Sequence, residues 1–181
     1  LHLPVQAGSD TVLRAMNRKH TGDDYRRIVE RLRAARPDIA LASDFIVGFP
    51  GESDADFEET LRLVRDVTYA QAYAFKYSAR PGTPAATAEA QVPEPVKVER
   101  LAALQALLAE QQTAFNRRFL GQTIPVLFDR PGRRPGQLAG RSPWQHAVHA
   151  AASADWQNRI VEITVANAGP RGLSSDAREA A

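Results

Sequence analysis

The sequence predicts an α/β fold followed by a small antiparallel β-domain, and three observations support this prediction. First, an apolar run at residues 39–47 ends at Gly48 and precedes a polar segment with helical spacing, the pattern of a buried strand, a glycine loop and a helix. Second, apolar runs and amphipathic stretches alternate up to residue 77, which is typical of parallel strands covered by helices. Third, short strand-length segments separated by Pro, Gly and Asp begin after Gly121.

The first part of the chain is expected to alternate strands and helices. Apolar residues at helical spacing support the helices, and Ser53 followed by Asp56 resembles a capping box. The expected elements, in order, are a strand end at 1–5, a short helix capped by Ser9 or Asp10, a helix from Gly22 to Pro37, a strand at 39–47, a helix at 55–67 and a strand at 70–77.

A long helix at 95–119 is expected to lead into the β-domain, with Gly121 ending it. The segments 123–128, 137–140, 147–151 and 160–165 have strand length and favour a small antiparallel β-barrel. The predicted domains are therefore 1–119 and 120–175, with a disordered tail at 176–181. The buried stripe predicted for the long helix consists of Val98, Leu101, Leu104, Leu107, Leu108 and Phe115.

The composition is that of a soluble globular protein: of 181 residues, 44% are hydrophobic and 24% are charged, and the net charge is +2. No apolar run approaches the ~20 residues that cross a membrane, and no signal-peptide pattern is present, so no membrane partner and a cytoplasmic location are expected. The chain contains no cysteine, which excludes a thiolate-ligated metal within it. It begins at Leu1 rather than at Met, and we expect it to be a fragment of a larger protein.

Polar residues near the expected strand ends are the first candidates for a site. Gln6 follows the first strand and Arg18 ends the next helix, so Arg18 could grip a carboxylate and Gln6 a hydroxyl or an amide. On spacing alone, a surface glutamine and a helix-capping arginine are more common. Tyr77, Ser78 and Arg80 follow the third strand. Arg80 could contact a phosphate or a substrate, although a solvated loop arginine and a packed tyrosine are more common.

Asp44 lies within the apolar strand at 39–47, and Ile46 shares its face because strand side chains alternate. A carboxylate buried there needs a partner, so Asp44 could accept hydrogen bonds from ribose hydroxyls. It could instead form a salt bridge or cap the neighbouring turn, and the sequence does not separate these roles. Gly48 and Gly51 are expected to leave room for a ligand to approach the backbone. The four histidines show no metal-ligand spacing, so no metal site is predicted.

A basic stretch from 117 to 141 holds six arginines and one acidic residue, Asp129. With Trp144, His146 and His149 nearby, it predicts an RNA-facing surface built from cations and a stacking ring. The absence of interleaved acids argues against a merely solvated face, although Trp144 and Trp156 could instead belong to a core. The arginines assigned to RNA are Arg130, Arg133, Arg134 and Arg141.

Four motifs, in order, resemble the radical S-adenosylmethionine methylthiotransferases. They are Leu-Pro-Val-Gln-Ala-Gly-Ser-Asp at 3–10, Met-Asn-Arg at 16–18, Asp-Phe-Ile-Val-Gly-Phe-Pro-Gly-Glu at 44–52 and Tyr-Ser-Ala-Arg-Pro-Gly-Thr-Pro-Ala-Ala at 77–86. The last part of the chain resembles the family's RNA-binding TRAM domain at Gly140 and Arg141, and only loosely at 144–152. The resemblance implies the C-terminal half of a radical SAM partial (β/α) barrel, followed by a small antiparallel β-barrel.

The resemblance also implies S-adenosyl-L-methionine as a cofactor and six residues that bind it: Gln6, Arg18, Asp44, Ile46, Gly48 and Ser78. Gln6 and Arg18 match positions near the cofactor's ribose and methionine carboxylate. Asp44 matches a ribose contact, and Ile46 and Ser78 match positions at the adenine. Gly48 belongs to the loop beside the cofactor.

The implied activity is methylthiolation of C2 of N6-isopentenyladenosine at tRNA position 37, with the tRNA anticodon stem-loop as partner. Tyr77 and Arg80 are possible substrate contacts. The motif at 78–84 favours this branch of the family over the threonylcarbamoyladenosine branch, which stays as an alternative. A branch that acts on a ribosomal protein ranks lower, because it usually has Gln-His where this chain has Gln6 and Ala7.

The cysteines that hold two 4Fe–4S clusters in this family lie upstream of the matched part and are absent from this chain. The N-terminal part of the same enzyme is therefore an expected partner, and the chain alone is expected to be catalytically inert. A non-catalytic RNA-binding module is the alternative from another class. A phosphate-binding hydrolase or aldolase on a barrel is a third, and no nucleophile–base pair supports it.

Overall fold

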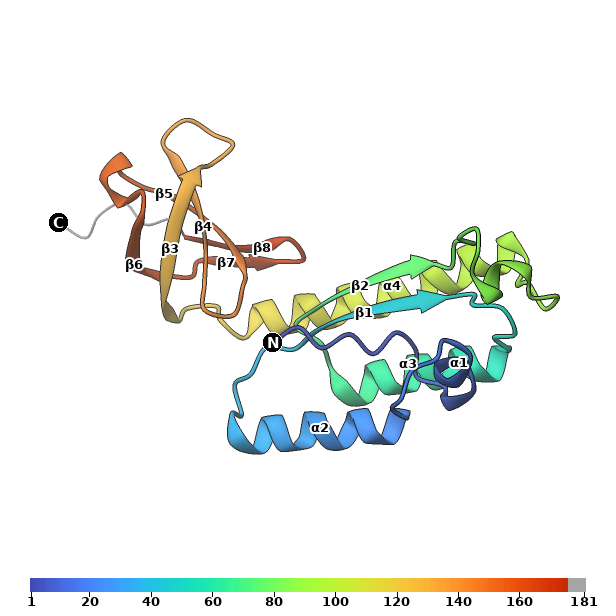
Figure 1. Ribbon diagram of the computed structural model, residues 1–181. Helices are drawn as coiled ribbons and strands as arrows, with labels where there is room; N and C mark the ends of the chain where they lie inside the picture. Colours follow the sequence, from blue (N-terminus) through green and yellow to red (C-terminus); the bar gives the residue numbers. More distant parts are fainter. Residues whose placement is uncertain (176–181) are drawn as a thin grey trace. The chain divides into compact units, whose positions relative to one another are not determined.

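β1 (Ala42–Val47) and β2 (Gln71–Lys76) form a parallel sheet in the first of the two units into which the chain divides, Leu1–Gln111 and Gln112–Ala181. The computed structural model describes residues 1–175 (Figure 1). The mixed α/β character predicted for the chain is confirmed, with a parallel sheet and helices in one unit and a six-stranded sheet in the other.

The N-terminal segment lies beside β1 and pairs with it only at isolated bridges, at His2 and Gln6. Pro4 has no N–H to donate to a ladder. The next N–H, of Val5, donates to the Ser43 hydroxyl at 3.1 Å instead of to a strand carbonyl. The segment therefore occupies the place of a third parallel strand without forming a continuous one.

Helices cover one face of this sheet, and the core lies between them and the strands (Figure 1). Phe45, Val47 and Ala74 point into that core from the strands and are at most 9% exposed. The helices are α1 (Asp10–Ala15), α2 (Gly22–Ala35), α3 (Asp54–Val67) and α4 (Glu94–Arg117), with a short 3-10 helix, η1 (Pro84–Thr87), before α4. Ser9 caps α1, and Ser53 and Asp56 form a capping box at α3, so both predicted caps are confirmed.

The opposite face of the sheet is open within the described residues and carries side chains that the register places in pairs. Asp44 lies beside Tyr73, and Ile46 lies beside Phe75. Tyr73 and Phe75 are 52% and 54% exposed, although parallel sheets usually have both faces covered. This open face is therefore where a ligand can meet β1 and β2.

The buried face of α4 differs from the predicted stripe. Val98 is 51% exposed, whereas Arg100, Leu104 and Leu108 are buried. These three residues follow one another at spacings of four, which keeps them on one side of a helix with 3.6 residues per turn. The placement of Val98 in the stripe was wrong because the charged Arg100, and not an apolar residue, continues the buried line.

The second unit is a six-stranded sheet with the order β6-β3-β4-β5-β8-β7. Its strands are β3 (Thr123–Pro131), β4 (Gln137–Arg141), β5 (Ala147–Ala151), β6 (Arg159–Thr164), β7 (Asn167–Gly169) and β8 (Gly172–Ser175), with a short 3-10 helix, η2 (Ala154–Trp156). The other pairings of the described strands in this unit are antiparallel, as predicted, whereas β5 and β8 pair in parallel, so the prediction was wrong for that pair. A parallel pair is possible there because β6 and β7 intervene in the chain and provide the crossover.

Alternating residues of these strands form the core of the second unit. Val126, Phe128 and Val148 are fully buried in it, and Phe119 packs against the same cluster. Among the helices of residues 1–175, none combines the length and the apolar character needed to cross a bilayer. The tail predicted to be disordered, at 176–181, lies outside the described residues.

Candidate functional site

Two of the predicted cofactor residues, Asp44 and Ile46, lie on the open face of the sheet, and a third, Gln6, is hydrogen-bonded to the same stretch of β1. The Gln6 N–H donates to the carbonyl of Asp44 at 3.0 Å, and the Gln6 carbonyl accepts from the Ile46 N–H at 2.9 Å. The Asp44 and Ile46 side chains are partly exposed, whereas Phe45 between them is fully buried on the other face. Asp44 and Ile46 therefore present neighbouring side chains to a ligand, and the backbone of Gln6 is fixed directly beside them.

Gln6 is held in the left-handed region, with φ at 78°, and is 8% exposed. A non-glycine residue in this region costs about 1–3 kcal/mol, and it persists where surrounding hydrogen bonds over-determine it. The two backbone bonds to β1 supply that constraint. Strained residues of this kind cluster at ligand sites, so the backbone of Gln6 supports the functional reading over that of a surface glutamine.

Asp44 has a partner and stays accessible. The Nε2 atom of His2 lies 3.3 Å from Asp44 Oδ2, a contact that is a salt bridge only when the imidazole is protonated. The Asp44 side chain is nevertheless 31% exposed, because it lies on the open face and not in the core. The carboxylate can therefore also accept hydrogen bonds from hydroxyl groups of a ligand.

The glycine loop after β1 is packed more closely than expected. Gly48 is buried with φ at 72°, and its N–H donates to Glu52 Oε2 at 3.0 Å. A Cβ at Gly48 would lie 2.4 Å from Cγ of Lys97, so a lysine stem fills the room expected there for a ligand. No room is left on that side of Gly48, whereas Gly51 has open space around it. Gly48 as a cofactor residue stays a prediction.

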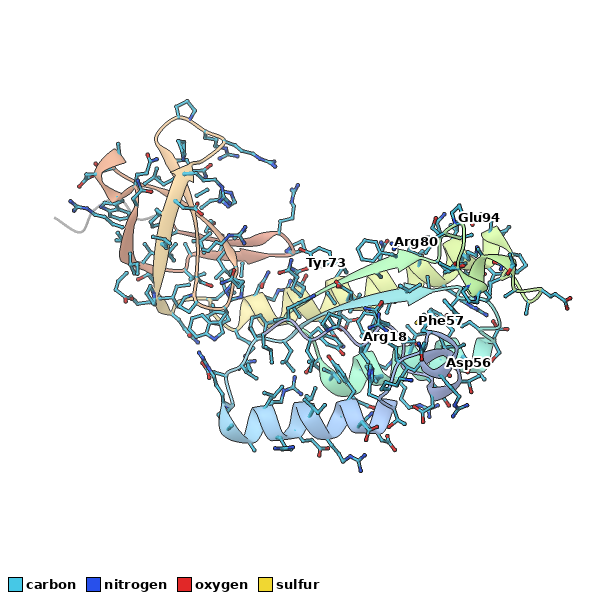
Figure 2. The ribbon with its side chains drawn as sticks, viewed as in Figure 1. Arg18, Asp56, Phe57, Tyr73, Arg80 and Glu94 are labelled. Atoms are coloured by element: carbon cyan, nitrogen blue, oxygen red, sulfur yellow. The ribbon has the colours of Figure 1, made fainter. Side chains whose placement is uncertain are left out.

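Tyr77 continues the sheet beyond β2, because its N–H donates to the Val47 carbonyl at 2.8 Å. Its ring packs edge-on against Phe49 at 5.1 Å between centroids, and the Lys97 ammonium lies 5.6 Å from the ring. The Tyr77 hydroxyl is buried without a hydrogen-bond partner in the described structure. Ser78 and Arg80, which follow, are both exposed (Figure 2 labels Arg80).

Arg18 is exposed and follows α1 (Figure 2). Its N–H donates to the Leu13 carbonyl at 2.8 Å, which fixes the backbone at the end of that helix. α1 packs Leu13 and Met16 into a small apolar cluster that includes Phe49 of the glycine loop. The first two motifs are therefore held against the third, and the Arg18 guanidinium is free to reach a carboxylate.

The loop that carries Gln6 is also clamped onto α3. The Ser9 hydroxyl donates to an oxygen of Asp56, and the Gly8 N–H donates to Thr60 Oγ1 at 2.9 Å. Burial opposes ionisation of Asp56, but hydrogen bonds from Ser53 and Ser9 outweigh it and hold the pKa of Asp56 below its usual value. The position of Gln6 is thus set by polar contacts that sequence reasoning assigned only to helix capping.

The arginines assigned to RNA lie on the hairpin of β3 and β4. Arg130 is near the end of β3, Arg133 and Arg134 are in the turn, and Arg141 ends β4 opposite Leu127. All four are exposed. Arg130 is already paired with Asp129 at 2.8 Å, so the turn arginines are the better candidates for phosphate.

The predicted stacking ring was wrong for His146, which is 7% exposed and lies among the rings of Phe115, Phe119 and Trp144. Its Nδ1 atom lies 2.8 Å from the Ser142 hydroxyl, and its Nε2 atom is buried without a partner in the described structure. Trp144 packs against Phe119 with 4.7 Å between ring centroids. These rings form part of a core, so they stabilise the sheet.

Burial lowers the pKa of His146 to about 4, from an ordinary 6.5. The unfolded chain therefore binds this proton first as the pH falls, and stability that is present above pH 6.5 is lost between 6.5 and about 4. We expect the urea midpoint of the second unit to decline between pH 6.5 and 5. Tryptophan fluorescence measures it, because both tryptophans, Trp144 and Trp156, lie in this unit.

Two matched variants test whether His146 causes this decline in the urea midpoint. His146→Phe keeps the aromatic packing and should remove most of the decline, whereas His149→Gln should keep it. A wild-type midpoint that stays level over this range would contradict a buried, neutral His146.

The residues fit S-adenosylmethionine and do not fit an iron–sulfur cluster. An accessible carboxylate at Asp44 and an exposed cation at Arg18 suit a ligand with hydroxyls and a carboxylate. Clusters need thiolates, and the chain has no cysteine. Within residues 1–175, no group of three or more His, Asp or Glu residues could hold a metal ion.

Comparison with known proteins identifies sequences similar to this chain. Residues 1–64 match the model of the Radical SAM superfamily. Over 174 residues the chain is 59% identical to a tRNA-2-methylthio-N(6)-dimethylallyladenosine synthase from Novosphingobium aromaticivorans. The match covers 96% of the chain and 39% of that curated relative. The resemblance to the radical SAM methylthiotransferases is thereby confirmed.

Sequence reasoning missed three residues that shape the site. Lys97 and Arg100 of α4 and the side chain of Glu52 all contact the glycine loop. The available signal was a charged residue on the apolar side of a long helix, together with a glutamate directly after a glycine turn. Neither pattern indicates which oppositely charged residue would be its partner in the fold.

Proposed function

We propose that this chain is the C-terminal part of a tRNA methylthiotransferase that replaces the C2 hydrogen of N6-isopentenyladenosine at tRNA position 37 with a methylthio group. The observation that carries the proposal is the 59% identity over 96% of the chain to a synthase of that nucleoside class. The Radical SAM match over 1–64 supports the reaction type. The open face with Asp44, Ile46 and Gln6 supports a ligand site there.

In this proposal the chain binds and orients S-adenosylmethionine, which supplies the radical precursor and the methyl group when bound. Asp44 accepts hydrogen bonds from its ribose hydroxyls, and Arg18 pairs with its methionine carboxylate. Ile46 and Ser78 contact the adenine, and Gln6 lies beside the ribose. Tyr77 and Arg80 at the strand end are the proposed substrate contacts. The two clusters are held by a cysteine-bearing N-terminal part of the same enzyme.

The second unit is proposed to be a TRAM domain that binds the anticodon stem-loop. Its support is the exposed arginine set of the β3–β4 hairpin, in which only Arg130 has an acidic partner among the ion pairs of the described residues. Exposed guanidinium groups without acidic neighbours suit a phosphate backbone. The RNA contact is expected at Arg133, Arg134 and Arg141.

The test is mass spectrometry of bulk tRNA nucleosides from a strain in which the gene encoding this chain is deleted. The 2-methylthio-isopentenyladenosine is expected to vanish while isopentenyladenosine accumulates, and the intact gene should restore it. Loss of the 2-methylthio derivative of threonylcarbamoyladenosine would favour the other branch instead. An unchanged nucleoside profile, together with stem-loop binding by the chain, would favour a non-catalytic RNA-binding module.

The isolated chain is proposed to be inert, because it lacks the cysteines. After iron–sulfur reconstitution, the 181-residue polypeptide should form no 5′-deoxyadenosine above background. Formation of 5′-deoxyadenosine would contradict the proposal that the N-terminal part of the enzyme, and not this chain, holds the clusters.

A further inference from the structure

The buried carboxylate of Glu52 forms a hydrogen bond across the glycine loop that follows β1. The Glu52 side chain is 3% exposed, and its Oε2 atom accepts the Gly48 N–H at 3.0 Å. This bond spans the turn that follows Asp44 and Ile46, so it fixes the backbone directly after the proposed ligand residues. Burial raises the pKa of Glu52, although the Gly48 N–H and Arg100 both oppose that rise.

Arg100 of α4 holds this carboxylate from the other side. Its side chain is 7% exposed, and its Nη1 atom donates to Glu52 Oε1 at 2.8 Å and to the Glu52 carbonyl at 3.1 Å. Its Nη2 atom donates to Asp54 at 2.6 Å, and its guanidinium lies 5.6 Å from the ring centre of Phe57. One planar guanidinium thus joins three oxygens at the start of α3.

Lys97, one turn before Arg100 on α4, contacts the same loop. Its Cγ atom lies 2.4 Å from the position that a Cβ of Gly48 would take, so the alkyl part of Lys97 covers the glycine. Residues three apart on a helix are neighbours on its surface. α4 therefore contacts the glycine loop at two points. Lys97 packs against Gly48, and Arg100 forms hydrogen bonds and an ion pair with Glu52.

A buried ion pair is an inefficient source of stability, since apolar residues of similar volume often stabilise a fold as well. The arrangement around Arg100 instead fixes a geometry, because only a guanidinium offers several donors in one rigid plane. We propose that Arg100 is a positioning residue that, through Glu52, holds the Gly48 loop in the conformation that S-adenosylmethionine requires. The identity of the ligand as S-adenosylmethionine rests on the proposed function, whereas the effect of Arg100 on the loop conformation does not.

Amide exchange measured by NMR on this chain tests the effect on the loop. In Arg100→Met, exchange at the Gly48 N–H is expected to accelerate by about tenfold or more, because the local opening free energy falls. Glu52→Gln should act in the same direction, and the double variant should add little to either single variant. The matched control is Arg65→Met, which breaks an Arg–Glu pair of the same 2.8 Å length that is exposed on α3, and it should leave Gly48 unchanged.

Kinetics of the complete enzyme test the ligand. Arg100→Met should raise the KM for S-adenosylmethionine in 5′-deoxyadenosine formation by about tenfold while kcat changes less than about threefold. Arg100→Lys should recover part of this loss, because it keeps the charge but not the fork.

Several outcomes would overturn the proposal. Unchanged exchange at Gly48 in Arg100→Met would do so, as would faster exchange with an unchanged KM. Where that variant does not fold, Asp54→Ala removes a partner whose side chain is 97% exposed, and wild-type exchange at Gly48 would again count against the proposal. A wild-type enzyme that forms no 5′-deoxyadenosine would refute the proposed function, and Gly48 exchange would then decide the positioning role alone.

Discussion

Gly8→Ala is expected to lower the stability of the first unit by about 3 kcal/mol, since overpacking against immobile atoms is costly. A Cβ at Gly8 would lie 2.5 Å from the Glu59 carbonyl oxygen and 2.6 Å from the Thr60 Cα. Both are backbone atoms of α3, so no side chain can rotate away. The loop must move off the helix, and the hydrogen bond from the Gly8 N–H to Thr60 is lost with it.

Urea unfolding followed by circular dichroism at a helical wavelength measures this effect, because α1, α2 and α3 all lie in the first unit. Ser9→Ala is the matched variant in the same loop. It removes the cap of α1 and the bond to Asp56 without adding an atom, and it should cost only about 1 kcal/mol. Equal losses in the two variants would show that polar contacts, and not close packing, hold the loop.

The same loop carries Gln6, so Gly8→Ala has a functional consequence. Displacing the loop breaks the backbone bonds that place Gln6 beside Asp44 and Ile46. In the complete enzyme, affinity for S-adenosylmethionine should fall by more than in Ser9→Ala. If the Gly8→Ala enzyme keeps full affinity for S-adenosylmethionine while its stability falls, the ligand does not bind at this loop.

Local patterns predicted much of the fold because local forces decide it. The caps at Ser9 and Ser53 and the strands at β1 and β2 follow from residue types at fixed spacings. β7 and β8 escaped prediction because they are short, and the parallel pairing of β8 depends on a crossover that no local pattern encodes.

The candidate site was harder to predict, since it depends on which charges meet. The sequence placed Asp44 in a buried strand, but its exposure depends on an open sheet face, which is a property of the whole unit. Arg100 interrupts an apolar stripe and therefore resembles a solvent-facing residue until Glu52 is brought to it by the fold. His146 was assigned to an RNA-facing surface because it follows a basic stretch, yet its ring packs into the aromatic core beside Phe119.

The turn arginines should dominate RNA binding by the second unit. We expect the double variant Arg133→Ala and Arg134→Ala to weaken binding of an anticodon stem-loop by about tenfold, because two exposed cations leave the phosphate-facing hairpin. Each lost phosphate contact should also reduce the slope of log affinity against log salt by about 0.7–0.9. Filter binding at several salt concentrations measures both quantities.

Arg130→Ala is the control that separates a specific contact from net charge. Its guanidinium already has an acidic neighbour, Asp129, at 2.8 Å, so it releases few counterions when RNA binds and its loss should change the slope little. All three arginines carry the same charge, so a model based on total charge predicts the same reduction for each. An equal reduction of the slope at Arg130 would therefore mean that diffuse attraction, and not the turn, determines the affinity of this hairpin for RNA.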